Sequence, residues 1–215
     1  GGISPSLEGE EMKVSEPGFK GGDRTDIELP QAQRKVMEML HRAGKRVVFV
    51  NCSGSAIAMV PETENAESIL QAWYPGERGG EAVAKVLFGE VNPSGKLPVT
   101  FYKSVNDLPD FLDYTMKNRT YRYFKGEALF PFGHGLSYTS YEYGKPVLKK
   151  VKNEERKMKN SSAYSLSFSL SNKGNREGTE VAQVYIRRMD DAEGPIKTLK
   201  AFKRITLKAG EKQQV

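Results

Sequence analysis

Hydrophobic residues recur every three or four positions between residues 29 and 43. The positions are Leu29, Ala32, Val36, Met39, Leu40 and Ala43. This spacing predicts an amphipathic helix, because side chains three and four residues apart lie on the same helix face. Pro30 suits the first helical turn, and Gly44 suits the position just after the last one.

Two short hydrophobic segments follow the predicted helix. Residues 46–52 form a Val-rich run with successive apolar positions at 47–50, which is typical of a strand covered on both faces of a parallel sheet. Residues 68–74 predict an adjacent strand, which Pro75 and Gly76 end before a further helix over residues 80–88, closed by Gly89. The order of strand and helix predicts an open α/β sheet with helices on its faces.

The C-terminal third of the chain changes to a period of two. The alternating apolar positions are Tyr164, Leu166, Phe168 and Leu170 in one run, and Ala182, Val184 and Ile186 in another. Such alternation predicts half-buried antiparallel strands, and the Asn-Lys-Gly-Asn sequence at 172–175 predicts a turn between them. We therefore expect an all-β, immunoglobulin-like sandwich after the α/β part, with an aromatic, Pro- and Gly-rich connection between the two.

The composition narrows the class of protein. A chain of 215 residues suits one large domain or two small ones. No apolar run approaches the roughly 18 residues that would predict a membrane span. One cysteine and two histidines argue against a disulfide framework and a Cys/His zinc site, so we expect no metal and no cofactor.

Charge divides the chain into two parts. Residues 1–144 hold 16 Lys and Arg against 19 Asp and Glu, whereas residues 145–215 hold 17 against 8. The basic excess is densest over residues 145–159, where an arm that binds nucleic acid is one interpretation. Glu154 and Glu155 interrupt this cluster, so we favour a solvated boundary and expect no nucleic-acid partner.

Several motifs are candidates for chemistry. The glycine-rich turn at 75–80 lies between a predicted strand and helix, where backbone amides can bind phosphate, but it matches no nucleotide-binding pattern. Ser53 and Ser55 lack the G-x-S-x-G context of a nucleophilic serine. His41 suits a helix surface, and His134, between two glycines, suits a turn whose backbone passes close to another group.

An acidic cluster of Glu8, Glu10 and Glu11 lies on the long loop predicted for residues 1–22. A carboxyl group on an irregular loop serves as a general acid or base when a neighbouring site positions it and shifts its pKa. Composition alone favours a solvated acidic loop.

The strings around this cluster and along the rest of the chain resemble the C-terminal part of glycoside hydrolase family 3. They are GGISPSLEGEE at 1–11, GDR at 22–24, LP-x-x-Q at 29–33, WYPG-x-x-GG at 73–80, NPSGKLP at 92–98, RTYRYF at 119–124 and PFGHGLSYT at 131–139. Residues 162–215 are similar to the fibronectin-type-III-like domain of that family. The resemblance covers essentially the whole chain in the same order.

The resemblance implies three segments. Residues 1–103 would be a partial family 3 α/β-sandwich domain without its first strands, 104–144 a connection, and 145–215 a partial fibronectin-type-III-like domain without its last strands. Family members are retaining, exo-acting β-glucosidases and β-xylosidases. Their Asp nucleophile lies in an N-terminal barrel, and in many members a Glu acid/base lies on a loop of the α/β sandwich.

The resemblance places the acid/base at Glu10, with Glu8 and Glu11 as alternates, and assigns no substrate-binding residues. It implies an oligosaccharide or aryl glycoside as substrate and a periplasmic or secreted location. The barrel and its nucleophile are not in this chain, so we expect the chain alone to be inactive and its partner to be the missing barrel domain of the same polypeptide.

Two other functions stay open on the residues alone. A non-catalytic carbohydrate-binding or structural module would use Trp73, Tyr121 and Tyr123 as platforms for sugar rings. An α/β nucleotide-binding protein would bind phosphate at the 75–80 turn.

Overall fold

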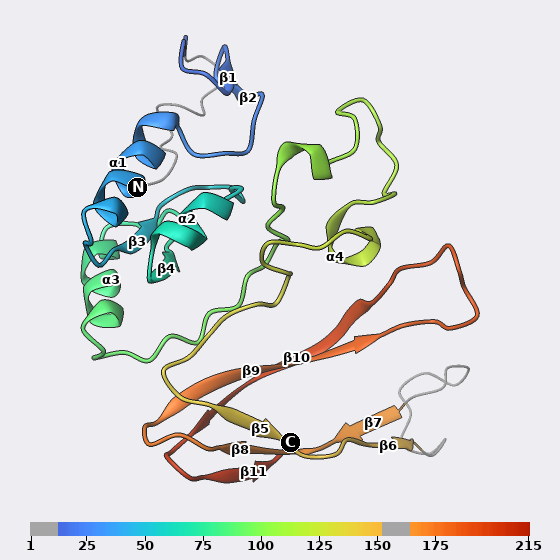
Figure 1. The fold of residues 1–215 in the computed structure, drawn as a ribbon. Coiled ribbons are helices and arrows are strands. Elements are labelled where there is room, and N and C mark those ends of the chain that lie inside the picture. Colours follow the sequence, from blue (N-terminus) through green and yellow to red (C-terminus); the bar gives the residue numbers. More distant parts are fainter. Residues whose placement is uncertain (1–12, 152–163) are drawn as a thin grey trace.

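A computed structural model describes residues 13–151 and 164–215, which form an α/β part followed by a β part (Figure 1). The α/β part contains β1 (Phe19–Lys20), β2 (Asp23–Arg24), α1 (Gln31–Arg42), β3 (Val48–Asn51), α2 (Val60–Asn65), β4 (Ser68–Gln71) and α3 (Gly79–Leu87). The connection holds a 3₁₀ turn (Val105–Asp107) and α4 (Thr120–Tyr123). The β part contains β5 (Tyr141–Tyr143), β6 (Val147–Lys150), β7 (Tyr164–Ser167), β8 (Ser169–Asn172), β9 (Gly178–Ile186), β10 (Thr198–Leu207) and β11 (Lys212–Gln214).

The parallel pairing expected in the first part is confirmed. Strands β3 and β4 pair in parallel, with Val48 opposite Ser68, and the short helix α2, which the hydrophobic pattern did not predict, lies between them in sequence. Two expectations were wrong. Val48 is half exposed, so β3 is not covered on both faces, and β4 ends at Gln71 because Trp73 adopts a positive φ of 55° that ends the extended conformation.

Helix α1 has the ends that its sequence predicts, but it buries a different face. Gly44 has a φ of 67° and its amide bonds to the carbonyl of His41, while the amide of Lys45 bonds to that of Leu40, which together make a Schellman cap. The predicted apolar stripe is largely exposed, at Val36 and Met39 among others. Met37 instead enters the core, so tertiary contacts and not the sequence period decide which face is buried.

The core of the α/β part forms where the sheet, α1 and the connection meet. Its buried members are Leu29, Met37, Phe49, Ile57, Met59 and Phe101. Trp73 and Phe130 each meet Phe101 edge-on, with ring centroids 6.0 and 6.2 Å apart. None of the helices in the described ranges has the length and apolar character needed to cross a bilayer.

In the β part, antiparallel strands are confirmed, but the predicted run from Tyr164 to Leu170 divides. Strand β7 pairs with β6, whereas β8 pairs with both β5 and β11. Tyr164 is exposed while Leu170 is fully buried, so the stripe does not share one environment. Strands β9 and β10 form a separate pair, and the core contains Leu170 of β8 with Ala182 of β9 and Leu207 of β10.

A buried ion pair joins the two parts. Lys96 Nζ lies 3.2 Å from Glu180 Oε2, donates to the carbonyl of Gly135 at 2.7 Å, and is largely buried, as is Glu180. Tyr143 donates to the other Glu180 oxygen at 3.0 Å. Arg204 of β10 also donates a hydrogen bond to Ser94 Oγ of the NPSGKLP string, at 3.1 Å. Side chains of the NPSGKLP string at residues 92–98, which we call the brace, therefore connect the α/β part to the β part.

The turn at Gly133 lets the β part approach the connection closely. Gly133 has a φ of 82°, and a Cβ there would overlap the Gln183 side chain and lie 2.7 Å from the Tyr185 hydroxyl. Gln183 donates to the carbonyl of Gly133 at 3.1 Å. Only glycine satisfies both the backbone angle and this contact.

We predict that Gly133→Ala lowers the free energy of unfolding by about 2 kcal/mol or more, because it adds backbone strain and steric overlap. Gly80→Ala is the matched control, since no atom lies within 4 Å of its Cβ position and its φ is ordinary for an L residue. The control should stay within about 0.5 kcal/mol of the parent or stabilise it. Urea unfolding measures both, and equal losses would contradict the close approach.

Stability at high pH should depend on Tyr143. Burial, followed by the charge of Glu180, raises the pKa of the Tyr143 hydroxyl above its ordinary value of 10.0. The folded state therefore holds this proton more tightly than the unfolded state, so the stabilisation is complete below pH 10 and is lost as the pH rises beyond it.

We expect the melting temperature of the parent to fall more steeply than that of Tyr143→Phe between pH 9 and pH 11. Tyr164→Phe, at an exposed tyrosine, is the control and should follow the parent. Parallel curves for the parent and Tyr143→Phe would show that Tyr143 does not titrate in this way.

Candidate functional site

The predicted acid/base residue Glu10 and its alternates Glu8 and Glu11 lie outside the described residues. The structure describes the chain from residue 13 onward, which includes the hairpin that follows in sequence. Strands β1 and β2 form a hairpin whose two turn residues, Gly21 and Gly22, both have positive φ, as a two-residue hairpin loop requires. Phe19 of β1 packs against the buried core of the α/β part. The β1–β2 hairpin is thus anchored to the α/β part.

Hydrogen bonds carry this anchoring from β2 to the start of α1. The amide of Thr25 bonds to the carbonyl of Gly18 at 2.8 Å, and Arg24 Nη1 donates to Ser55 Oγ at 2.7 Å. Asp26 Oδ1 then accepts the amide of Glu28 at 2.9 Å. These hydrogen bonds hold residues 18–28, which we call the stem, both to one another and to the loop that follows β3.

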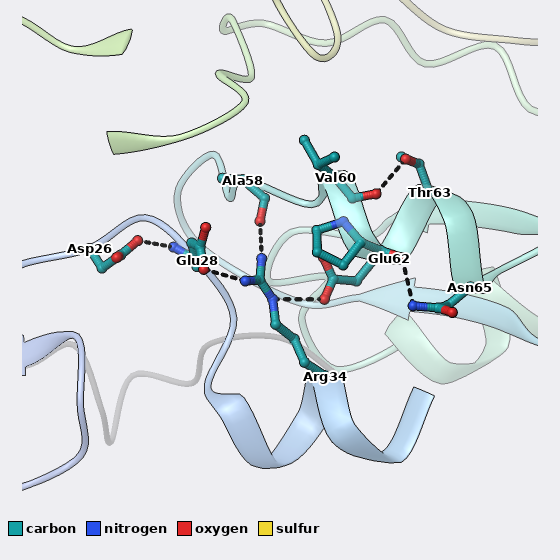
Figure 2. A network of polar contacts seen from close by, with 9 residues as sticks. Asp26, Glu28, Arg34, Ala58, Val60, Glu62, Thr63 and Asn65 are labelled. Atoms are coloured by element: carbon teal, nitrogen blue, oxygen red, sulfur yellow. Dashed lines mark hydrogen bonds and ion pairs between the residues drawn. The ribbon is translucent and has the colours of Figure 1, made fainter. Parts of the chain in front are cut away.

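Arg34 of α1 is the centre of the polar network at the stem (Figure 2). Its guanidinium pairs with Glu28, lies 3.0 Å from Glu62 Oε1 of α2, and donates to the carbonyl of Ala58 at 3.1 Å. Glu62 is 1% exposed. A carboxylate this deeply buried requires a paired cation, so Arg34 fixes α1, α2 and the stem relative to one another.

Ser53 and Ser55, which follow β3, use their hydroxyl groups in hydrogen bonds within the protein and are not free nucleophiles. Ser53 is fully buried, and its hydroxyl donates to the carbonyl of Ser55 at 3.0 Å and accepts from Asn51 at 3.1 Å. Ser55 accepts from Arg24. Their positions at the end of β3 explain why small polar residues occur there.

His134 lies in the predicted turn, and its ring contacts Phe130. Its ring stacks on Phe130 with centroids 5.3 Å apart, and burial, followed by the charge of Lys96, lowers its pKa below 6.5. The flanking glycines allow close approach to the protein itself, since a Cβ on Gly135 would overlap the carbonyl of Gly95. This supports the turn interpretation. His41, by contrast, is exposed in the last turn of α1.

The glycine-rich turn at 75–80 also has a packing explanation. A Cβ on Gly79 would overlap the Pro75 ring, and Gly76 has a φ of 72°. Glu81, in the first turn of α3, pairs with Arg78 at 2.6 Å and with Lys85 at 2.5 Å. A carboxylate therefore already occupies the region where a phosphate would benefit from the helix dipole.

Two of the aromatic residues considered as sugar platforms are used inside the protein. Trp73 packs against the α/β core. Tyr121 stacks on Phe132 with centroids 4.2 Å apart, and its hydroxyl accepts the amide of Leu199 at 3.1 Å. Tyr123 lies beneath the guanidinium of Arg122. In the part of the chain that the structure describes, no three His, Cys, Asp or Glu residues gather as a metal site would need.

Periodicity and composition gave none of the charged residues that organise this region a structural role, although Lys96 lies in the NPSGKLP string at 92–98. Arg34, Glu62, Lys96 and Glu180 occur in segments whose periodicity predicts only helix, strand or loop. A charged residue at an otherwise inward-facing strand position was the one available signal, and it applies to Glu180, which alternates in phase with Ala182.

Comparison with known proteins gives a consistent result. A family model described as the glycosyl hydrolase family 3 C-terminal domain matches residues 2–138, and one described as a fibronectin type III-like domain matches residues 180–215. The chain is 54% identical to a xylan 1,4-beta-xylosidase of Xylanibacter ruminicola, over 98% of this chain and 24% of the relative. It is 37% identical to a periplasmic beta-glucosidase of Salmonella typhimurium, over 91% of this chain and 27% of the relative.

Solved structures agree with these sequence matches. The structure of DesR, a beta-glucosidase from Streptomyces venezuelae solved with D-glucose, superposes on this chain with a TM-score of 0.79 at 30% identity. The superposed region is 91% of this chain and 26% of the DesR chain. The chain spans about a quarter of the length of the curated relatives it matches.

We predict that Arg34→Met destabilises the protein by about 3–5 kcal/mol, because it leaves the buried Glu62 carboxylate without its cation. Arg42→Met on the same helix is the matched control, since Arg42 pairs with Glu38 on the exposed surface. The control should cost about 0.5 kcal/mol or less. Urea unfolding compares the two variants, and similar losses would refute the role of the Arg34 network.

Proposed function

The chain belongs to glycosyl hydrolase family 3, and on that basis we propose that it is the acid/base-bearing part of a retaining β-glycosidase that removes terminal, non-reducing β-linked sugars. The observation that carries this proposal is the family match over residues 2–138, a range that contains the Glu8-Gly9-Glu10 string. The relatives with β-xylosidase and β-glucosidase names support the same type of reaction.

The proposed chemistry divides between this chain and another domain. Glu10 protonates the oxygen of the departing group and later activates the water that releases the sugar. Retention needs a second carboxyl about 5 to 5.5 Å away, which acts as the nucleophile. That carboxyl is an Asp of a barrel domain in the same polypeptide, so the 215-residue chain alone hydrolyses nothing.

The anchored stem supports a role for this loop. A proton donor must be held within hydrogen-bond reach of the leaving oxygen, and a loop can do this only if its base is fixed. The β1–β2 hairpin, which begins nine residues after Glu10 at Phe19, and the Arg34 network fix the chain that follows this loop. The glycine beside Glu10 leaves the tip able to enter a cleft when substrate binds.

We propose a β-xyloside as the sugar, because the relative at 54% identity is a xylan 1,4-beta-xylosidase. Xylose lacks the hydroxymethyl group of glucose, so kcat/KM for nitrophenyl β-xyloside and β-glucoside, measured on the polypeptide that the gene encodes, separates the two classes. A periplasmic or secreted location is proposed alongside, supported by the periplasmic name of one relative. Binding of xylan without turnover would favour a carbohydrate-binding module instead.

We predict that Glu10→Ala in the gene-encoded polypeptide slows hydrolysis of xylobiose-type substrates by ~10² to 10⁴. Formation of the glycosyl-enzyme from a dinitrophenyl glycoside should be largely spared, because its leaving group departs without protonation. Azide should restore turnover, since it attacks the glycosyl-enzyme without needing a general base. Steady-state and pre-steady-state kinetics measure each step.

Glu8→Ala and Glu11→Ala are the matched controls for this prediction. Both remove a carboxyl from the same loop and should leave the leaving-group dependence unchanged. If either control shows the azide-rescued pattern while Glu10→Ala is near neutral, the acid/base is that residue. If none of the three shows it, the acid/base lies elsewhere.

A further inference from the structure

Trp73 and Tyr74, the aromatic pair that follows β4, lie in different environments. Trp73 packs against the core of the α/β part, whereas Tyr74 is 48% exposed. Trp73 has a φ of 55°, in the left-handed region that L residues rarely adopt. Backbone strain of this kind persists where surrounding contacts enforce it, and it concentrates at functional sites. The strained residue thus separates a buried aromatic side chain from an exposed one.

The exposed tyrosine lies against Gly54, in the loop that follows β3. A Cβ at Gly54 would lie 2.7 Å from Tyr74 Cε2, 3.2 Å from Cζ and 3.3 Å from the hydroxyl oxygen. Gly54 has no positive φ, so the contact with the ring, and not the backbone angle, requires glycine at this position. The phenol end of Tyr74 is therefore held on a floor of bare backbone.

The chain after Tyr74 is fixed as well. Pro75 comes next, and a proline restricts the backbone of the residue before it. The Pro75 ring packs on Gly79, where a Cβ would overlap it, and Gly76 completes the turn with a φ of 72°. A side chain held in this way loses little conformational freedom when it binds a ligand, so Tyr74 is a preorganised contact.

Tyr74 follows the edge at which the carboxyl ends of two parallel strands meet. Asn51 and Gln71, the last residues of β3 and β4, lie opposite each other, and Asn51 Nδ2 donates to Gln71 Oε1 at 2.5 Å. Asn51 Oδ1 is buried and has no donor among the described residues, so these residues do not complete the hydrogen bonding of the edge. Open α/β sheets bind their ligands outside the carboxyl ends of the strands.

The stem reaches the same edge. Arg24 of the stem donates to Ser55 Oγ at 2.7 Å, and Ser55 follows Gly54, the residue on which Tyr74 lies. The loop after β3 therefore contacts both the stem and Tyr74 and holds them together. A single exposed tyrosine needs no explanation. One that combines a strained neighbour, a glycine floor and a place at this edge has the features of a binding residue.

We propose that Tyr74 is a substrate-contact residue, which packs against a sugar ring on the leaving-group side of the scissile bond. This rests on the proposed function, in which the terminal sugar is removed and the rest of the substrate departs. A pyranose ring presents a face of C–H groups, and an aromatic ring offers such a face a large apolar surface. Sequence reasoning considered Trp73 for this role, and the structure moves the contact by one residue.

Kinetics with two substrates tests the proposal on the gene-encoded polypeptide. Xylotriose has two sugar units on the leaving-group side, whereas β-xylosyl fluoride has only fluoride there. We expect Tyr74→Ala to lower kcat/KM for xylotriose about tenfold, chiefly by raising KM, and to change kcat/KM for β-xylosyl fluoride by less than about twofold. Tyr74→Phe and Tyr74→Trp keep an aromatic ring and should stay within about threefold of the parent.

Tyr164→Ala is the matched control, because it removes a tyrosine that is 58% exposed on β7, and it should change neither substrate. Equal losses on both substrates would show that Tyr74 supports the fold or packs against another domain. No loss on either substrate would show that the ring contacts no sugar. Both results overturn the proposal.

A second variant displaces the ring without removing it. Gly54→Ala adds the Cβ that would meet Tyr74, so it should lower kcat/KM for xylotriose by about threefold or more and spare β-xylosyl fluoride. Gly80→Ala, whose Cβ meets no atom within 4 Å, should change neither. A uniform loss, or none, for Gly54→Ala also contradicts the proposal.

Failure of this contact is distinguishable from failure of the proposed function. A selective loss for Tyr74→Ala together with a near-neutral Glu10→Ala refutes only the assigned acid/base. The expected Glu10→Ala pattern together with a neutral Tyr74→Ala refutes only the sugar contact. If the parent prefers glucosides, cellotriose and β-glucosyl fluoride form the equivalent pair. A parent that hydrolyses neither pair refutes the proposed function and this contact with it.

Discussion

The buried carboxylate of Glu62 is the constraint around which the α/β part is organised. A charge removed from water this completely must be neutralised nearby, and Arg34 is the group that does so. Arg34 also pairs with Glu28 and donates a hydrogen bond to the carbonyl of Ala58. The residue that neutralises Glu62 therefore also positions α1, α2 and the stem relative to one another.

A second constraint connects the two parts of the chain. Lys96 and Glu180 are both largely withdrawn from solvent and come from the brace and from β9. Tyr143 completes the hydrogen bonding of the carboxylate. The resulting joint is polar, so its strength depends on every partner remaining in place, and the glycine at 133 permits the approach that the joint requires. A fixed joint of this kind holds the β part against the α/β part.

Local signals in the sequence were reliable where the backbone itself sets the structure. Pro30 and Gly44 marked the limits of α1, Gly89 marked the end of α3, and alternation with a period of two marked antiparallel strands. Two of the family strings hold a glycine that a turn or a close approach needs, at Gly76 and Gly133. The acid/base role of Glu10 came from the resemblance, and it stays a prediction.

These local signals did not predict which side chains are buried. The apolar stripe of α1 is exposed while Met37 is buried, and the run from Tyr164 to Leu170 is shared between two sheets. The sequence determined the limits of α1 and α3, because caps act over a few residues. Only the tertiary structure decided which face is covered and which charges meet: Arg34 with Glu62 is a separation of 28 residues, and Lys96 with Glu180 is one of 84. Such pairs depend on the relative placement of whole elements, which no local pattern encodes.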